Sequence, residues 1–269
     1  MGRSQLIAVA VAAVAFVTIA FGMERLAPAM RDGASAVTKL SSTSARALMR
    51  EATDGMDARA EAEIHGLERM LDAAESDARK VDLLKQLSGA WYRAGRPALA
   101  GHFAEQVAET APTDTAYSIA ATTYSLCLRR DSLSAKQRAF CSERAVPAYE
   151  TAISLAPANP AHRLNLAIHL AENPPPDNPM RGILLLRELN EANPDDVPVL
   201  LQLGRLALQT GQNEKARERL SHAVDVEPAN RQAQCLLAEA AGRLGDVATA
   251  TTAAQACAEL ATPPPGNPN

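Results

Sequence analysis

The chain has 269 residues, of which 47% are apolar but only 3% aromatic, and a formal net charge of −4. The shortage of aromatic residues argues against a β-sandwich and favours helices that pack through small side chains. The negative charge, with no run of five or more Lys or Arg, argues against a nucleic-acid-binding protein.

The amino terminus contains an uncharged apolar run at residues 6–22. This run is long enough to cross a bilayer, for which about 17–25 residues are needed. We therefore expect residues 1–22 to be a signal anchor, making the protein single-pass in the inner (cytoplasmic) membrane with the remainder in the periplasm. The alternative is a cleaved signal peptide with its cleavage site at Ala27-Pro28-Ala29, which would leave a soluble periplasmic protein. Glu24 and Arg25 lie between the run and that site and favour the anchor.

The next two segments differ in pattern. Residues 23–57 are polar and rich in Ala, Ser and Thr, which predicts a linker or stalk, or a loosely held helix. Within residues 58–80, Ile64, Leu67 and Leu71 recur at helical spacing. We predict that this segment is a lead-in helix that caps the array following it.

Residues 81–262 read as five helical hairpins in sequence. Equivalent residues of the fourth and fifth units support this, because they recur at a constant spacing. Gly245 follows Gly211 by 34 residues, and Ala250 follows Ala216 by 34 residues. The first four units close at prolines, namely Pro112, Pro157, Pro194 and Pro228. Extra residues are predicted in the turn around 129–140 of the second unit, and a non-helical Pro-rich insert at 173–179 in the third. Residues 263–269 are predicted to be a disordered Pro-rich tail.

The hairpins resemble the tetratricopeptide repeat family, whose 34-residue unit has the pattern W-x2-L-G-x2-Y, A-x3-F, a later A, and P. The fourth unit matches at Leu203, Gly204, Ala216, Ala223 and Pro228, and the second has tyrosines in the aromatic positions, at Tyr117, Tyr124 and Tyr149. The resemblance implies an all-α, right-handed α-solenoid of about five hairpins, preceded by the transmembrane helix. It also implies a concave groove that binds a protein or an extended peptide.

The family's groove-facing positions, carried onto this sequence, give a mixed polar set. These candidate peptide-binding residues are Lys85, Arg93, Asn165, Gln202, Arg205, Gln209 and Arg243. Four of them, Lys85, Arg93, Asn165 and Arg205, are able to pair with an anionic peptide end. The alternative is that they are ordinary solvated helix positions.

The four cysteines form no CxxC motif, which disfavours zinc and thioredoxin-type redox sites. In the predicted hairpins Cys127 and Cys141 flank one turn, and Cys235 and Cys257 lie on the two helices of the last unit. We hypothesise two disulfides, Cys127–Cys141 and Cys235–Cys257, provided that each pair of Cα atoms lies within about 4.4–6.8 Å. The alternative is four buried small apolar residues.

No catalytic motif is evident, since the sequence lacks HExxH, a phosphate-binding loop and a nucleophile elbow. His169 is expected to have a structural role, and Asp195 and Asp196 to cap a helix instead of binding metal. We therefore expect no enzyme, cofactor, metal or small-molecule substrate.

The sequence predicts a membrane-anchored adaptor or scaffold that holds another protein in a bacterial cell envelope, with no nucleic acid as partner. One alternative is an assembly chaperone similar to the repeat-containing factors of cytochrome c maturation. The other is a structural subunit of a membrane complex.

Overall fold

The structure, a computed structural model, describes residues 45–52 and 55–261. Residues 45–52 are helical, and no strand occurs within the described ranges. The later helices are α2 (Ala58–Asp72), α3 (Asp77–Arg93), α4 (Pro97–Thr110), α5 (Asp114–Leu128), α6 (Ala135–Leu155), α7 (Pro160–Glu172), α8 (Arg181–Ala192), α9 (Val197–Gln209), α10 (Asn213–Val226), α11 (Arg231–Leu244) and α12 (Val247–Glu259).

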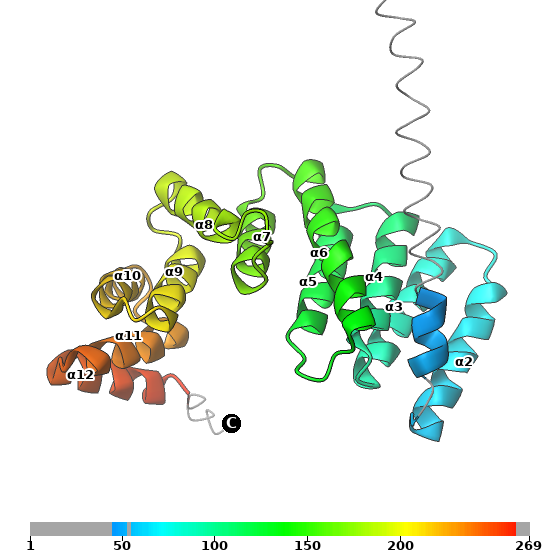
Figure 1. Cartoon of the computed structure of the whole chain (residues 1–269), viewed down its shortest axis with the longest axis horizontal. Coiled ribbons are helices and arrows are strands. Elements are labelled where there is room, and N and C mark those ends of the chain that lie inside the picture. Colours follow the sequence, from blue (N-terminus) through cyan, green and yellow to red (C-terminus); the bar gives the residue numbers. More distant parts are fainter. Residues whose placement is uncertain (1–44, 53–54, 262–269) are drawn as a thin grey trace, which may run out of the picture.

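From α3 onward, consecutive helices pack in pairs, so that the described chain contains the five predicted hairpins. The hairpins follow one another along the long axis of the molecule, from α2 at one end to α12 at the other (Figure 1). We call the first helix of each pair an A helix (α3, α5, α7, α9, α11) and the second a B helix. Neighbouring hairpins contact through A helices at α5–α7 and at α9–α11, so the A helices share one side, the A-helix face.

Local sequence signals set the helix boundaries. Eight of the described helices begin at a Ser, Thr, Asn or Asp whose side chain accepts a hydrogen bond from a backbone N–H of the first turn. These caps are Asp57, Ser76, Thr113, Ser134, Asn159, Asp196, Asn230 and Asp246. Of the two predicted caps, Asp196 is confirmed, because its Oδ1 accepts from the Val199 amide at 3.1 Å. Asp195 does not cap the helix, and its Oδ1 lies 2.8 Å from His222 Nε2. Gly95, Gly211 and Gly245 have φ near +73° in the turns of three hairpins, a conformation that suits glycine.

The two hairpins without a turn glycine carry the inserts. The Pro-rich insert is confirmed as the non-helical connection 173–180. The extra residues of the second unit behave differently from the prediction, since the connection covers only 129–134 and α6 is lengthened to 21 residues. Ser134 and Gln137 form a reciprocal capping box at the start of α6, which stabilises this added helical length.

The amino-terminal boundary also differs from the prediction. Residues 45–52 belong to the segment predicted as a linker, a stalk or a loosely held helix; they form a helix that is not loosely held, because its Ala45, Leu48 and Ala52 are buried in the same apolar cluster as α2, α3 and α4. Residues 58–80 are not one capping helix, because α2 ends at Asp72 and α3 begins at Asp77. Burial of the apolar side of residues 45–52 therefore extends the packed body by a further helix.

The predicted anchor at residues 1–22 and the predicted tail at 263–269 lie outside the described residues. Among the helices that are described, none is both long and apolar enough to span a bilayer.

The apolar core is divided along the array. One cluster covers residues 45–145, one covers α9 to α12, and two smaller clusters lie around α7. Within the hairpins, glycines allow close approach: a Cβ on Gly204 would lie 2.7 Å from the Leu220 side chain, and one on Gly182 would lie 2.4 Å from the Ala171 backbone nitrogen. Small residues at helix crossings therefore set the spacing between the two helices of these hairpins.

Both hypothesised cysteine pairs are disulfide-bonded in the structure. The Cα atoms of Cys127 and Cys141 are 6.4 Å apart, and those of Cys235 and Cys257 are 5.1 Å apart. The first bridge joins two fully buried residues at the α5–α6 turn. The second joins α11 to α12, of which Ala253 is the one buried residue.

We predict that Gly182→Ala destabilises the protein by about 1–3 kcal/mol, since the added Cβ meets backbone atoms of α7 that have no room to move. Gly204→Ala should be milder because its contact is a side chain. Urea unfolding measures both.

The matched control is Gly242→Ala, which lies in α11 with nothing within 4 Å of the added Cβ. It should be stabilising by up to about 1 kcal/mol through helix propensity. A neutral Gly182→Ala would contradict the close packing of α7 and α8.

We predict that reducing Cys235–Cys257 loosens α12 first. This helix buries little apolar surface, and a bridge with a sequence separation of 22 contributes about 3 kcal/mol. Hydrogen exchange of residues 247–259 in a Cys235→Ser/Cys257→Ser variant should be much faster than in the native chain, with α3 to α6 unchanged. Unchanged protection of α12 in the variant would show that the Cys235–Cys257 disulfide does not hold α12 in place.

Candidate interaction surface on the A helices

The structure distributes the seven predicted groove residues over four A helices. Lys85 and Arg93 are on α3, Asn165 is on α7, and Arg243 is on α11, while Gln202, Arg205 and Gln209 are on α9. The three residues of α9 are spaced by three and four positions and therefore share a side of that helix. All seven are partly or fully exposed.

Two of the predicted cations are already paired within the protein. Arg93 Nη2 lies 2.6 Å from Glu63 Oε1 of α2. Arg243 Nη2 lies 2.6 Å from Glu239 Oε1, and its Nη1 donates to the Leu208 carbonyl at 2.7 Å. These arginines connect neighbouring helices, and a ligand would have to compete with those contacts.

Lys85 and Arg205 are different, because neither forms a hydrogen bond or an ion pair with any described residue. Three other cations of α3 are paired: Arg79 with Asp82, Lys80 with Asp77, and Arg93 with Glu63. Lys85 and Arg205 are thus the predicted groove cations that remain available to a partner.

Lys85 lines a cleft of about 470 Å³ between α3, α4 and α5, which we call the α3–α5 cleft. The other lining residues are uncharged: Val81, Ser88, Gly89, Ala104, Val107, Ala111, Thr113, Thr115, Ala116 and Ile119. Ile119 is 56% exposed although it is a large apolar residue. The volume falls within the range of about 300–1,000 Å³ typical of ligand pockets.

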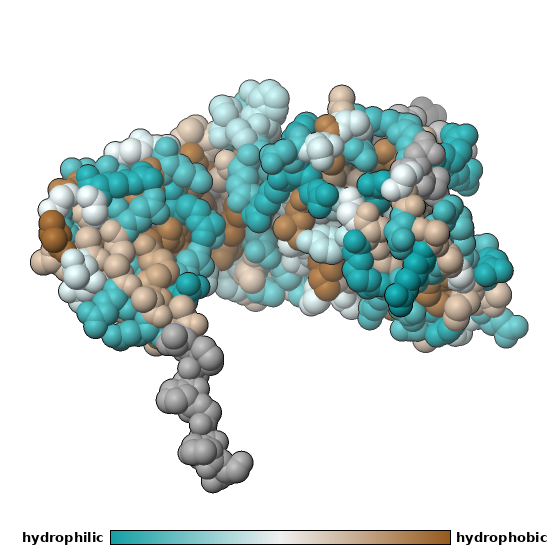
Figure 2. Space-filling view, turned by 90° about the horizontal axis from the view of Figure 1, so that it is seen from below, coloured by the Kyte–Doolittle hydropathy of each residue, from teal (hydrophilic) through white to brown (hydrophobic). Residues whose placement is uncertain are grey.

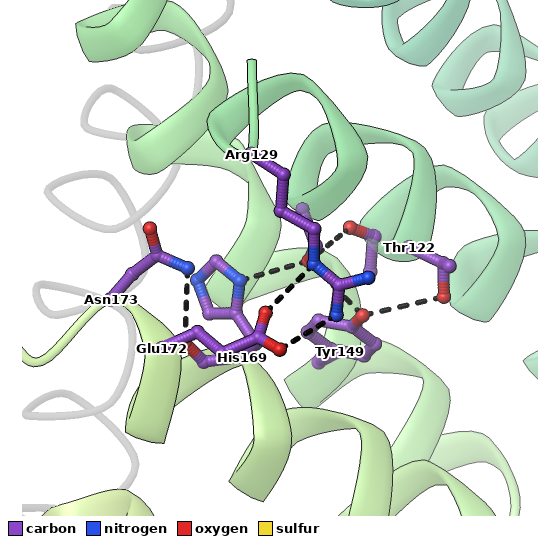
Figure 3. A network of polar contacts seen from close by, with 8 residues as sticks. Thr122, Arg129, Tyr149, His169, Glu172 and Asn173 are labelled. Atoms are coloured by element: carbon purple, nitrogen blue, oxygen red, sulfur yellow. Dashed lines mark hydrogen bonds and ion pairs between the residues drawn. The ribbon is translucent and has the colours of Figure 1, made fainter. Parts of the chain in front are cut away.

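A polar network follows at the junction of the second and third hairpins, drawn in Figure 3. His169 Nδ1 of α7 lies 2.8 Å from Ser125 Oγ of α5, which in turn lies 3.2 Å from the Tyr149 hydroxyl of α6. Arg129 binds the Glu172 carboxylate through Nε at 2.9 Å and Nη2 at 2.8 Å. We call these five residues and Thr122, whose hydroxyl lies 3.3 Å from that of Tyr149, the α5–α7 network.

The predicted residue Asn165 lies beside the α5–α7 network. Together with Thr122, Ile168 and Glu172 it lines a narrow cleft of about 110 Å³. The A-helix face therefore changes from apolar at α3–α5 to polar at α5–α7.

The Ser125–His169 pair is buried, with 6% of Ser125 and 3% of His169 exposed. The Ser125 hydroxyl has one proton and two acceptors within reach, the Ala121 carbonyl at 2.9 Å and, in the tautomer with a bare Nδ1, His169 Nδ1 at 2.8 Å. Burial, with a further contribution from Arg129, lowers the pKa of His169 to about 4, so the ring is neutral at pH 7. This agrees with the expected structural role.

Sequence reasoning missed the α5–α7 network as a unit. A signal was present, because Ser125 follows Ala121 by four residues and His169 follows Leu166 by three, on the stripes that face inward. Polar residues at such positions need partners when buried. Their partners come from three helices, which periodicity along one helix does not reveal.

The B-helix side also has a cleft, of about 440 Å³, lined by Ile153, Leu184 and Leu185 among others. Its charged residues are paired with one another, Arg181 with Glu150 at 2.8 Å and Arg163 with Glu188 at 3.5 Å. Both arginines that line this cleft are therefore paired, whereas Lys85 of the α3–α5 cleft is not.

The exposed surface is polar over most of the side seen in Figure 2, with hydrophobic residues in separate patches instead of one continuous area. No cluster of three or more His, Cys, Asp and Glu side chains suited to a metal ion occurs in the part of the chain that the structure describes.

Residues 181–260, which span α8 to α12, match the family model described as tetratricopeptide repeat. Among solved structures, a tetratricopeptide repeat protein from Parabacteroides merdae ATCC 43184 is 15% identical, with a TM-score of 0.52, covering 82% of this chain and 81% of that one. This likeness shows a shared helical-repeat fold.

Two further solved structures are similar to this chain. PilW, described as a widely conserved type IV pilus biogenesis factor, is 17% identical over 67% of this chain and 77% of its own, with a TM-score of 0.48. A thermophilic tetratricopeptide repeat protein of Thermus thermophilus is 18% identical over 67% of this chain and 91% of its own, with a TM-score of 0.47. No curated protein matches the chain.

We predict that protonation of His169 weakens folding as the pH falls. Its pKa of about 4 in the folded state is below the ordinary value of 6.5, so between these pH values the unfolded chain binds a proton that the folded one does not. Stability should therefore decrease from pH 6.5 toward pH 4, by at most about 3 kcal/mol from this residue.

Other groups titrate in the same range. The pKa of His102 is also lowered to about 4 by burial, whereas burial raises the pKa values of Glu105 and Glu109, which acts in the opposite direction. The native chain should therefore be compared with His169→Gln by urea unfolding at several pH values. His169→Gln should lose less stability than the native chain as the pH falls from 6.5 to 4. An equal loss in the two proteins would show that the pKa of His169 is not lowered by folding.

Proposed function

We propose that the protein is a membrane-anchored tetratricopeptide-repeat adaptor of a bacterial cell envelope that holds a partner protein, or an extended peptide from it, along the A-helix face. Tetratricopeptide-repeat proteins are typically interaction scaffolds, and the match of residues 181–260 supports that class. The finer statements rest on particular residues.

The observation that carries the proposal is the pair of unpartnered cations on the A-helix face. Lys85 on α3 and Arg205 on α9 belong to the first and fourth hairpins, so a partner touching both would extend along several repeats. An extended contact of this kind is the usual way in which a stacked array of hairpins binds, because its side is long and continuous.

The envelope location is supported by the two disulfides, since such bonds persist mainly in oxidising compartments such as the periplasm. Membrane attachment through residues 6–22 is supported by their uninterrupted apolar sequence. A non-catalytic role is supported by the burial of Ser125 and His169, the one Ser–His pair within hydrogen-bond distance in the described part of the chain.

We predict that charge reversal at Lys85 and Arg205 together abolishes reversible partner binding, because repulsive carboxylates would replace the ammonium and guanidinium groups. Affinity purification of the full chain in mild detergent, followed by mass spectrometry, identifies the partner whose binding is then measured. The matched control is Arg59→Glu/Arg138→Glu, two exposed cations on α2 and α6 away from the A-helix face.

Loss of the partner in the Lys85→Glu/Arg205→Glu variant but not in the control supports the adaptor. A stoichiometric partner that ignores both double variants would instead indicate a structural subunit of a membrane complex. A preference for unfolded proteins over folded ones would indicate an assembly chaperone.

A further inference from the structure

We infer that the α3–α5 cleft binds an apolar segment of the partner that carries one acidic side chain, placed against Lys85. This inference rests on the proposed function and adds to it where on the A-helix face the partner is recognised, and by which chemistry.

The cleft is built for apolar side chains. Val81, Val107, Ala104 and Ala116 present methyl groups to it, and its volume of about 470 Å³ has room for several side chains. Ile119 stands 56% exposed beside them, although its neighbours Ala120 and Ala121 on α5 are fully buried. Covering Ile119 and the cleft walls would remove apolar surface from water, which favours association.

Lys85 is the one charged residue that lines the cleft. It has no partner among the described residues, while the neighbouring Arg79, Lys80 and Arg93 of α3 each pair with a carboxylate. An ammonium group beside an apolar wall attracts a carboxylate more strongly than one surrounded by water, because the wall lowers the local dielectric constant. A ligand that matches the charge of the cleft therefore carries a single negative group.

The polar groups around Lys85 favour an internal Asp or Glu over a chain-terminal carboxylate. The Ser88 hydroxyl already donates to the Ala100 carbonyl at 2.9 Å, and the Thr113 hydroxyl, which accepts from the Ala116 amide at 3.1 Å, is a neutral donor, so Lys85 is the one charged donor that lines the cleft. A terminal carboxylate is best held by several converging donors, whereas a lysine offers one point charge. One cation among apolar residues suits one side-chain carboxylate flanked by apolar neighbours.

Gly89 keeps the cleft open and offers a way to close it. A Cβ added there would meet only the Arg93 Nη1 atom, at 3.3 Å, at the end of a flexible and exposed side chain. Gly89→Leu would therefore project a side chain into the cleft without displacing the core, and the change from glycine favours the helix. This variant tests the cavity separately from the charge of Lys85.

The experiment is a selection of binding peptides from a displayed random-peptide library on the full chain in mild detergent. The selected peptides are then synthesised with an amidated carboxyl end, labelled, and titrated by fluorescence polarisation. We expect them to share one Asp or Glu between apolar residues. Lys85→Glu should weaken their binding about tenfold, which corresponds to the loss of one favourable charge contact, and Gly89→Leu about fivefold or more.

Two controls accompany these variants. Lys85→Arg should stay within about threefold of the native affinity because it keeps the charge, and Arg138→Glu on α6 should have no effect because it lies away from the cleft. Thermal unfolding verifies that each variant is folded before its affinity is compared.

The remaining outcomes separate this inference from the proposed function. Binding lost in Arg205→Glu but kept in Lys85→Glu and Gly89→Leu would overturn the cleft while leaving the adaptor in place. Peptides that lack an acidic residue, or that bind only with a free carboxyl end, would also overturn it. Failure of every peptide to bind above background would contradict both.

Discussion

Close approach of the two helices within each hairpin is the constraint on which the structure depends. At Gly182 an added Cβ would lie 2.4 Å from a backbone atom of α7, and at Gly204 an added Cβ would lie 2.7 Å from the Leu220 side chain of α10. Because the two helices approach so closely at these glycines, the hairpin is thin and its B helix covers one side of its A helix. The opposite side of the A helix is left for solvent or for a partner. The candidate interaction surface is thus a consequence of small residues on the side of the A helix that faces its B helix.

The stack is not held by one uninterrupted apolar core. Between the second and third hairpins, the α5–α7 network places Ser125, Tyr149 and His169 in buried contact, and Arg129 and Glu172 cover it with a bidentate ion pair. Buried polar contacts are directional, so they fix the relative orientation of α5 and α7 more narrowly than apolar packing would. Lys85 and the α3–α5 cleft lie on one side of this junction and Arg205 on the other. Their separation therefore depends on the network.

Much of the architecture could be predicted from the sequence because it follows from local rules and a constant period. The 34-residue phase, the closing prolines and the turn glycines locate the hairpins, and the hairpins in turn bring each cysteine pair together. Lengthening of α6 was missed because a count of extra residues does not say whether they form a loop or a helix. Packing of residues 45–52 as a helix was not distinguished from a linker or a loosely held helix, because so short a segment with a few small apolar side chains gives a weak periodic signal.

The candidate surface was predictable only in outline. The repeat pattern places Lys85, Arg93, Arg205 and Arg243 on the A helices, but it does not reveal that Glu63 and Glu239 already engage two of them. Glu63 belongs to α2, outside the repeat pattern, so its contact with Arg93 follows from tertiary packing. The α3–α5 cleft likewise arises where small residues of three helices meet, and no single helix carries its signature.

The central claim is that a partner is held along the A helices, which the B helices only support. The most direct measurement is hydrogen-exchange mass spectrometry of the full chain with and without its co-purified partner. We predict added protection in α3, α5 and α9, and in the part of α4 that lines the α3–α5 cleft, with little change in α6, α8 and α10. Protection confined to the B helices would contradict the claim.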